Sequence, residues 1–265
     1  MISQKKIKNF QEKILAWYEK NKRDLPWRKT TNPYEILVSE IMLQQTQVDR
    51  VIPFYHRFLA SFPDLESLAK AEKHSLLEHW SGLGYNSRVL RLQKLAQQVK
   101  ELPQEKEVLE NLPGIAPYSS SAILAFAFNK PFPVIDTNIR RVLLHEFQLS
   151  VETPQTELQD LALQCIPRGK SRIWHNALMD FGALQATSKK TGIESLSKQS
   201  AFKGSTRWVR GQIVKTLLKE RKISIYAFKK DLKEKYSSQT IDRIMQKMEK
   251  DDIIKREGNQ IALAE

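Results

Sequence analysis

An acidic residue near a tight Pro-Gly turn is the first feature of this sequence that could do chemistry. Pro113-Gly114 lies between two helical runs, and such a turn leaves backbone N–H groups at the start of the next helix that suit a phosphate. Asp136 follows Tyr118 after 18 residues. A carboxylate beside a phosphate site on a basic chain weakens binding. Asp136 is therefore a candidate for chemistry, or more simply the N-cap of a helix starting at Thr137.

The elements that must position Asp136 are helices. Apolar residues recur with a helical period and short breaks, and alternating strand patterns are almost absent before the C-terminus. We therefore predict an all-α core. The predicted helices span 7–20, 34–43, 47–61, 65–71, 75–80, 87–101, 106–111, 118–128, 156–166 and 172–184, with a loop at 21–33.

The last part of the chain has a different composition. A polar linker at about 186–205 precedes helices predicted at 207–220, 224–235 and 238–250, and then two strands around Gly258-Asn259. Three helices and a hairpin match a winged helix-turn-helix. We therefore predict two domains, a core at 1–200 and a winged helix at 201–265. We expect the winged helix to contact DNA, and the alternative is that it serves only for protein contacts.

Composition limits the class of protein. The 265 residues are 41% hydrophobic, lack an apolar run long enough for a membrane span, and carry a net charge of +13. Such a positive charge indicates an anionic partner, usually nucleic acid. A basic protein without such a partner is nearly as good an interpretation of the composition. With one cysteine, Cys165, and no apolar leader, we expect an intracellular, cytoplasmic protein (nucleoid-associated if bacterial) without a disulfide or a metal site.

Two stretches carry a resemblance to a known family. Residues 112–118, followed by Asp136, resemble the hairpin and catalytic aspartate of the helix–hairpin–helix DNA glycosylases. Residues 39–48, SEIMLQQTQV, are similar to the adenine glycosylase branch, the MutY family. The resemblance covers about 10–182 and implies a core of two helical lobes with a cleft between them.

The resemblance assigns chemistry to two carboxyl groups. Breaking an N-glycosidic bond requires a protonated leaving base and negative charge beside the sugar cation. The family implies that Glu40 protonates adenine N7 and that Asp136 stabilises the sugar. Tyr118 and Asn138 would support both carboxylates by hydrogen bonds. Taken without its motif, Glu40 would be a solvated glutamate on a helix face.

The family also implies contacts with the flipped base and with DNA. Gln45 and Thr46 would intercalate, and Leu83 and Tyr85 would wedge beside the opposing base, although an isolated Tyr85 would be read as a core aromatic. The adenine pocket would be lined by Arg23, Trp27, Arg28, Leu43, Asn176 and Asp180. Phosphate contacts would come from Pro113, Gly114, Ile115 and Arg140, with Arg141 and Lys130 nearby.

This sequence departs from the family at two places. Ala186, Ile193, Leu196 and Phe202 stand where four cysteines usually hold an iron–sulfur cluster. We expect these four residues to form a small hydrophobic cluster instead, and the protein to carry no cofactor, as in clusterless adenine glycosylases. We also expect no Nudix-like domain of the kind that usually reads 8-oxoguanine, so that preference would rest on the predicted wedge residues and the wing.

The sequence as a whole predicts a monofunctional glycosylase acting as a monomer on duplex DNA. It would remove adenine mispaired with 8-oxoguanine or guanine in base excision repair. A tyrosine at 118 cannot form the Schiff base that a lysine forms in bifunctional relatives, so we expect no efficient strand cleavage. The alternatives are a thymine or uracil mismatch glycosylase on the same fold, and a non-catalytic DNA-binding regulator.

Overall fold

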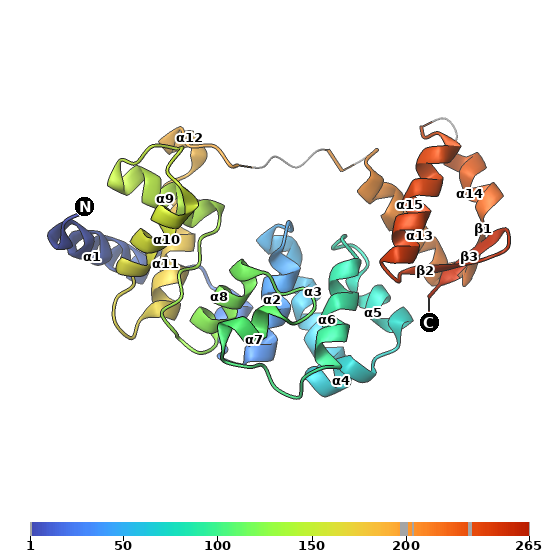
Figure 1. Ribbon diagram of the computed structural model, residues 1–265, viewed down its shortest axis with the longest axis horizontal. Coiled ribbons are helices and arrows are strands. Elements are labelled where there is room, and N and C mark those ends of the chain that lie inside the picture. Colours follow the sequence, from blue (N-terminus) through green and yellow to red (C-terminus); the bar gives the residue numbers. More distant parts are fainter. Residues whose placement is uncertain (1, 197–200, 203, 233–234, 265) are drawn as a thin grey trace. The chain divides into compact units, whose positions relative to one another are not determined.

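The computed structural model describes residues 2–196, 201–202, 204–232 and 235–264 (Figure 1). The fold is mostly helical, which confirms the predicted all-α class. The helices are α1 Gln4–Asn21, α2 Pro33–Leu43, α3 Val48–Ser61, α4 Leu65–Lys70, α5 Lys73–Trp80, α6 Ser87–Ala96, α7 Lys106–Glu110, α8 Pro117–Phe126, α9 Thr137–Phe147, α10 Gln155–Gln164, α11 Ser171–Leu184, α12 Ser188–Thr191, α13 Thr206–Glu220, α14 Ile225–Leu232 and α15 Ser238–Lys250. The strands are β1 Lys222–Ser224, β2 Ile254–Glu257 and β3 Gln260–Leu263.

Among the differences from the predicted elements, three have a clear local cause or position. Helix α6 ends at Ala96 rather than 101, because the next side chains, at Gln97 and Gln98, are exposed and give a further turn nothing to bury. The loop at 21–33 contains a short 3-10 helix, Pro26–Arg28. Strand β1 has only three residues, too few to show a period, and forms by pairing with β3.

The chain forms two compact units. Unit 1 contains Met1–Glu40 and Leu102–Lys198, and unit 2 contains Ile41–Glu101 and Gln199–Glu265. The first boundary falls within α2. Residues 199–265 thus group with 41–101, whereas the sequence predicts a division into 1–200 and 201–265. That residues 1–200 and 201–265 are two separate domains remains a prediction.

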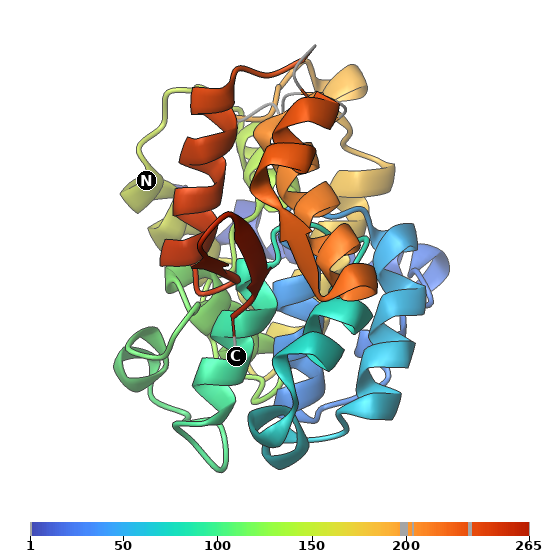
Figure 2. The same ribbon diagram turned by 90° about the vertical axis from the view of Figure 1, so that its right-hand side faces the viewer.

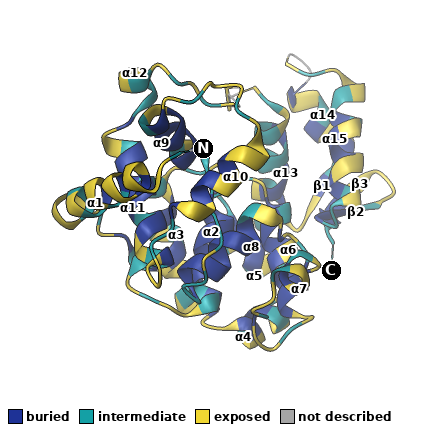
Figure 3. Ribbon diagram, turned by 60° about the vertical axis from the view of Figure 1, so that its left-hand side comes forward, coloured by how far each residue is buried: buried dark blue, intermediate teal, exposed yellow. Residues whose placement is uncertain are grey.

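Unit 1 is organised around α11, which packs against α1, α8 and α9. Its core includes a cluster of aromatic rings in which Phe10 contacts Trp174 and Phe147 edge to face, with centroids 5.4 and 5.0 Å apart. Figure 3 shows α8 almost wholly buried, and its small residues allow that close packing. Packing within this unit fixes α8, which carries Tyr118, and α9, which begins directly after Asp136.

Helices α11 and α9 are in close contact at Gly182. A Cβ atom at this position would lie 2.8 Å from both the Cβ and the carbonyl oxygen of Asn138. Backbone atoms cannot move aside as a flexible side chain can. Glycine is therefore required here for packing, and it sets the place of the first turn of α9.

Unit 2 has its own aromatic core and a small sheet. Phe58 on α3 contacts Phe62 and Trp80, with ring centroids 5.0 and 5.7 Å apart. The strands form an antiparallel sheet in the order β1-β3-β2, with Ile223 and Arg256 both opposite Ile261. The predicted helices and hairpin at the C-terminus are present (orange to red in Figure 2).

The C-terminal segment is anchored within unit 2 by polar contacts as well as by packing of α13 on α5. Lys73 and Lys94 each lie 3.3 Å from a carboxylate oxygen of Asp252, which follows α15. His74 Nε2 lies 3.4 Å from the carbonyl oxygen of Leu218. That the segment is a DNA-binding winged helix remains a prediction. Among the described residues, no helix has both the length and the apolar character needed to span a bilayer.

The close approach at Gly182 predicts that Gly182→Ala destabilises the protein. Because the added methyl group meets backbone, we expect a loss of about 1–3 kcal/mol in the free energy of unfolding, measured by urea denaturation. Gly211→Ala in α13 is the matched control, since no atom lies within 4 Å of its added Cβ. That control should be neutral or about 0.5–1 kcal/mol more stable. Equal effects of the two substitutions would contradict the packing argument.

Candidate active site

Helices α2, α8 and α9 bring together Glu40, Tyr118 and Asp136, which all belong to unit 1. Glu40 lies on α2 among apolar residues that are almost all buried, and is itself only 8% exposed. The hydroxyl of Tyr118, in the first turn of α8, forms a hydrogen bond with the Glu40 carboxylate. The charge of Asp136 also acts on Glu40. Glu40 therefore does not lie on a solvated helix face.

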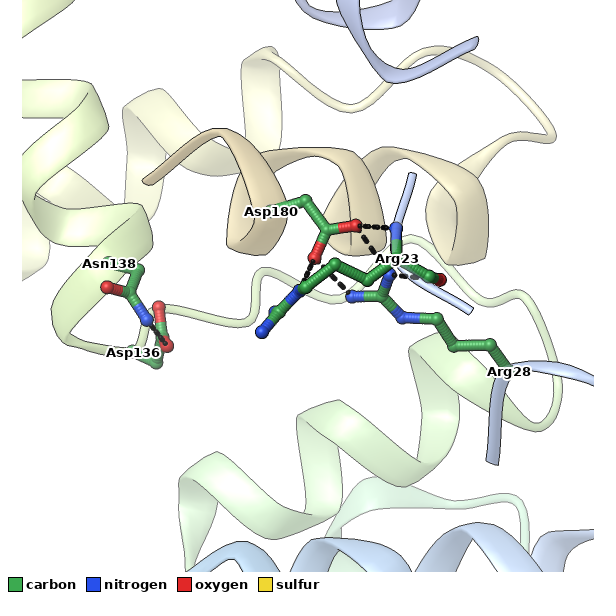
Figure 4. A network of polar contacts seen from close by, with 5 residues as sticks. All are labelled: Arg23, Arg28, Asp136, Asn138 and Asp180. Carbon is green, nitrogen blue, oxygen red and sulfur yellow. Dashed lines mark hydrogen bonds and ion pairs between the residues drawn. The ribbon is translucent and has the colours of Figure 1, made fainter. Parts of the chain in front are cut away.

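Asp136 is the N-cap of α9, as its position in the sequence predicts. Its Oδ1 accepts a hydrogen bond of 2.7 Å from the Ile139 amide, and its Oδ2 accepts one of 3.0 Å from Nδ2 of Asn138 (Figure 4). Asn138 Oδ1 accepts in turn from Nη1 of Arg141 at 3.1 Å. This chain of donors fixes the orientation of the Asp136 carboxylate.

The surroundings of these groups change their proton affinities in different ways. Burial, and then the charge of Asp136, raise the pKa of Glu40 to about 7, although the Tyr118 hydrogen bond lowers it. Burial also raises the pKa of Asp136, but hydrogen bonds from Ile139 and Asn138 oppose the increase. The pKa of Tyr118 lies well above its ordinary value, first because of burial and then because of Glu40.

The surroundings of the two carboxyl groups suit them to different chemical tasks. Near neutral pH a substantial fraction of Glu40 retains a proton that it can donate, while the hydroxyl of Tyr118 keeps its own. Asp136 has amide donors directed at it, which favour the anion. One group that can protonate a leaving base and one that can remain negative are what N-glycosidic bond cleavage requires.

The predicted phosphate site lies between α7 and α8. Gly114 is exposed with a φ of +85°, a left-handed conformation that a glycine adopts without strain. The N-cap of α8 is Ala116, whose side chain cannot accept hydrogen bonds from the first-turn amides. Pro113 is half-buried, and Ile115 is 8% exposed. The turn therefore presents backbone rather than side chains, as an anion site of this kind requires.

The two arginines of α9 are placed differently from what the sequence predicts. Arg140 and Arg141 are each only 8% exposed. Arg140 Nη2 donates to the carbonyl of Val151 at 2.5 Å, and Arg141 Nε donates to the carbonyl of Ile193 at 3.1 Å. Both guanidinium groups thus satisfy main-chain carbonyls inside unit 1. We therefore assign any phosphate contact at this site to the backbone of the turn rather than to Arg140. Lys130 likewise donates to the carbonyl of Gln104.

Asp180 on α11 fixes the loop that contains Arg23 and Arg28 (Figure 4). Its fully buried carboxylate accepts from Nε of Arg23 at 2.5 Å and from Nη1 and Nη2 of Arg28 at 2.6 and 2.8 Å. Burial opposes ionisation of Asp180, but Arg28 and Arg23 outweigh it and hold its pKa below the ordinary value. The two arginines that the sequence assigns to a base pocket are therefore bound to Asp180 in this structure.

The remaining pocket residues are divided between the units. Trp27 in the same loop is 9% exposed, and Asn176 on α11 is half-buried. Leu43, at the end of α2, is also half-buried and belongs to unit 2. Trp27, Asn176 and Leu43 stay predictions as contacts of a flipped base.

The four positions that replace cysteines do not form the predicted hydrophobic cluster. Ala186 is buried and Ile193 packs partly against the core of unit 1. Leu196 is 78% exposed and Phe202 57% exposed, so neither is a member of such a cluster. The prediction of a four-residue cluster is wrong, because the segment is held by two of these side chains and by the Arg141 hydrogen bond to Ile193. In the described part of the chain, no three or more His, Cys, Asp or Glu side chains gather as a metal site would need.

The predicted wedge residues lie on two loops of unit 2. Gln45 is exposed and Thr46 half-buried, while Leu83 is only 6% exposed and Tyr85 is 36% exposed. Gln45 and Tyr85 have φ values of 60° and 49°, a conformation that non-glycine residues seldom adopt. Such backbone outliers cluster at functional sites. Intercalation and opposing-base contact stay predictions for all four residues.

Sequence reasoning missed Arg88, a buried residue that joins these two loops. Its Nη1 donates to the carbonyls of Ile41 and Gln44, each at 2.6 Å, and its Nη2 donates to the carbonyl of Gly84 at 3.1 Å. Burial lowers the pKa of Arg88 to about 10, so the guanidinium stays charged near neutral pH. The signal in the sequence is an arginine on the apolar face of its helix, four residues before Leu92.

Comparison with known proteins places the chain in a family. Residues 38–167 match the HhH-GPD superfamily of base excision DNA repair proteins. Adenine DNA glycosylase from Mycolicibacterium smegmatis is 32% identical over 230 residues, which cover 77% of this chain and 78% of that protein. Adenine DNA glycosylase from Mus musculus is 35% identical over 222 residues, 77% of this chain. The chain spans only 43% of the length of the mouse protein.

Solved structures agree with this placement. A thermostable thymine-DNA glycosylase has a TM-score of 0.65 and 31% identity, covering 71% of this chain and 93% of that one. A trapped endonuclease III–DNA covalent intermediate has a TM-score of 0.62 at 18% identity, covering 75% of this chain and 92% of that one, and supports the fold alone. Fold and site thus define a helix–hairpin–helix protein of the base excision repair class. The chain belongs to this superfamily, among its MutY-like members.

The raised pKa of Glu40 predicts a pH-dependent stability that Glu40→Gln removes. Folded Glu40 ionises near pH 7, whereas the unfolded residue ionises near its ordinary value of 4.5. Folding therefore binds a proton between these values, and the wild type loses stability as pH rises from 4.5 to 7. We expect Glu40→Gln to gain on the order of 2–3 kcal/mol relative to wild type between pH 5 and pH 8, measured by urea denaturation.

Glu19→Gln on α1 is the control for this experiment, because Glu19 is exposed and far from the site in sequence. It should follow the wild-type dependence on pH. A Glu40→Gln protein whose stability relative to wild type is the same at pH 5 and pH 8 would contradict the burial argument.

Proposed function

We propose that this protein is a monofunctional DNA glycosylase that releases adenine from mispairs in duplex DNA during base excision repair. The observation that carries the proposal is the buried Glu40, whose pKa is raised to about 7 beside Asp136 and Tyr118. Adenine has a basic N7 that can accept a proton from such a group. The names of relatives from Mus musculus and Mycolicibacterium smegmatis support the same base.

The residues of the site account for each step of this reaction. The adenine nucleotide leaves the base stack to reach them. Glu40 donates its proton to N7, and the glycosidic electron pair departs with the base as neutral adenine. Asp136 stabilises the sugar cation that remains, held by Ile139 and Asn138. Water then adds to the anomeric carbon and loses a proton to the ionised Glu40, which restores the acid and gives an abasic site. Tyr118 supplies no amine that would cut the strand.

DNA binding is proposed from backbone and charge. The uncapped first turn of α8 offers amides to a phosphate, and the chain has a net charge of +13. Exposed basic side chains on α15, namely Arg243, Lys247 and Lys250, support a further contact by the C-terminal segment. Duplex DNA with adenine opposite 8-oxoguanine or guanine is the proposed substrate. The protein would act in the cytoplasm as a monomer.

We further propose that no iron–sulfur cluster is present. The whole sequence contains one cysteine, and Cys165 is buried, with its pKa raised to about 12 by that burial. A thiol of that kind is a poor metal ligand because the thiolate is the ligating form. Ile193 and Arg141 instead hold the segment where the resembled family has its cluster.

A second candidate is a glycosylase that removes thymine opposite guanine. The 31% identity with a thermostable thymine-DNA glycosylase favours it. Thymine has no N7, so this reaction gives a protonated Glu40 no equivalent acceptor. We therefore place this function second.

Single-turnover base release distinguishes the two functions. The substrates are duplexes with one central pair, namely adenine opposite 8-oxoguanine, guanine or thymine, and thymine opposite guanine. We expect adenine release at the first two pairs only. Removing the acid or the stabilising anion should slow it by at least about a hundredfold in Glu40→Gln and in Asp136→Asn.

The rate at adenine–guanine should also fall as pH rises through about 7, because only protonated Glu40 donates. Glu19→Gln again serves as the control and should match wild type. Release of thymine, or adenine release that survives Glu40→Gln, would contradict the proposed function.

A further inference from the structure

The C-terminal segment reaches the Tyr85 loop directly. Arg207, in the first turn of α13, donates from Nη1 to the Tyr85 hydroxyl at 2.9 Å. Its guanidinium carbon lies 5.6 Å from the centroid of the Tyr85 ring, within the range of a cation–π contact. Both residues belong to unit 2. A residue of the appended segment thus contacts a residue predicted to touch the opposing base.

The same ring has a second guanidinium beside it. The guanidinium carbon of Arg88 lies 5.5 Å from the ring centroid. Arg88 is fixed by its hydrogen bonds to the carbonyls of Ile41, Gln44 and Gly84. The position of Tyr85 is therefore defined by Arg88 from the core and by Arg207 from α13.

The backbone restricts this loop further. Tyr85 has a φ of 49°, and Gly82 has a φ of +116°. A Cβ atom at Gly82 would come within 2.8 Å of the Phe54 ring. Tyr85 is nevertheless 36% exposed, so its ring is not a core residue. The Tyr85 ring is thus held on a constrained backbone with its hydroxyl bonded, and part of it is accessible from outside the protein.

Helix α13 can hold Arg207 in a fixed place. Val209, Ile213 and Leu217 on α13 are buried, and the helix packs on α5. Arg210 forms an ion pair with Asp251 at 2.5 Å. Arg207 thus extends from a helix that is anchored on two sides.

We propose that Arg207 is a positioning residue for Tyr85, through which the C-terminal segment takes part in reading the base opposite the target adenine. The proposal rests on the proposed function. A side chain held in one rotamer before binding loses less entropy when it meets the DNA. The segment would then contribute to specificity through a contact inside the protein, without itself reading a base.

Single-turnover adenine release tests this, with saturating enzyme and adenine opposite 8-oxoguanine or guanine. We expect Arg207→Gln and Tyr85→Phe each to lower the rate about five- to tenfold and to change the ratio between the two pairs. The double variant should be no slower than the slower single variant, because both changes break the same contact. Lys215→Gln is the matched control, an exposed cation on the same helix, and should retain the wild-type rates and ratio.

Urea unfolding of the wild type, the two single variants and the double variant without DNA gives a readout independent of catalysis. The midpoint shifts of Arg207→Gln and Tyr85→Phe should be non-additive in the double variant. If wild type releases no base from any duplex, the proposed function fails while this cycle still tests the contact.

Two results would overturn the proposal. One is additive effects of Arg207→Gln and Tyr85→Phe on the rate or on unfolding. The other has two parts. The ratio of the release rates at the two pairs stays unchanged in Arg207→Gln, and the slope of log binding constant against log salt concentration falls by about 1 in Arg207→Gln but not in Tyr85→Phe. That second pattern would make Arg207 a plain phosphate contact.

Discussion

A carboxyl group buried beside a second carboxyl group keeps its proton up to near neutral pH, and Glu40 is held in that situation by three helices. Helix α2 buries it, α8 brings the Tyr118 hydroxyl, and α9 places Asp136 nearby. The arrangement costs stability because ionised Glu40 is poorly solvated. Such a cost is typical of a group poised for proton transfer. Contacts elsewhere in unit 1 hold these groups in place.

The network around Asp136 shows how this is done. Asn138 donates a hydrogen bond to the Asp136 carboxylate and accepts one from Arg141. Arg141 also donates to the carbonyl of Ile193. Because Gly182 has no side chain, α11 can lie against Asn138; a Cβ atom at this position would force the two helices apart. One chain of hydrogen bonds and one close helix contact thus connect the Asp136 carboxylate to a segment that the resembled family holds with a metal cluster.

Local spacing was enough to predict some of these features and not others. The N-cap at Asp136 and the hairpin at Gly258 follow from neighbouring residues, and the structure contains both. The places of Arg140 and Arg141 depend on carbonyls of Val151 and Ile193, which no local pattern reveals. Likewise, apolar character alone led to the wrong cluster of four residues, because hydrophobicity does not say which side chains can reach a common core. The contact between Arg207 and Tyr85 joins residues 122 positions apart.

The central claim is that Glu40 carries a proton near neutral pH, and carbon-13 NMR of its side-chain carboxyl group tests this most directly. Glutamate labelled at the carboxyl carbon would be titrated in the folded protein, with Glu40→Gln identifying the resonance. The account predicts a midpoint near pH 7 for that resonance. A midpoint near the ordinary value of 4.5 would show an ionised carboxylate at neutral pH and would contradict the account.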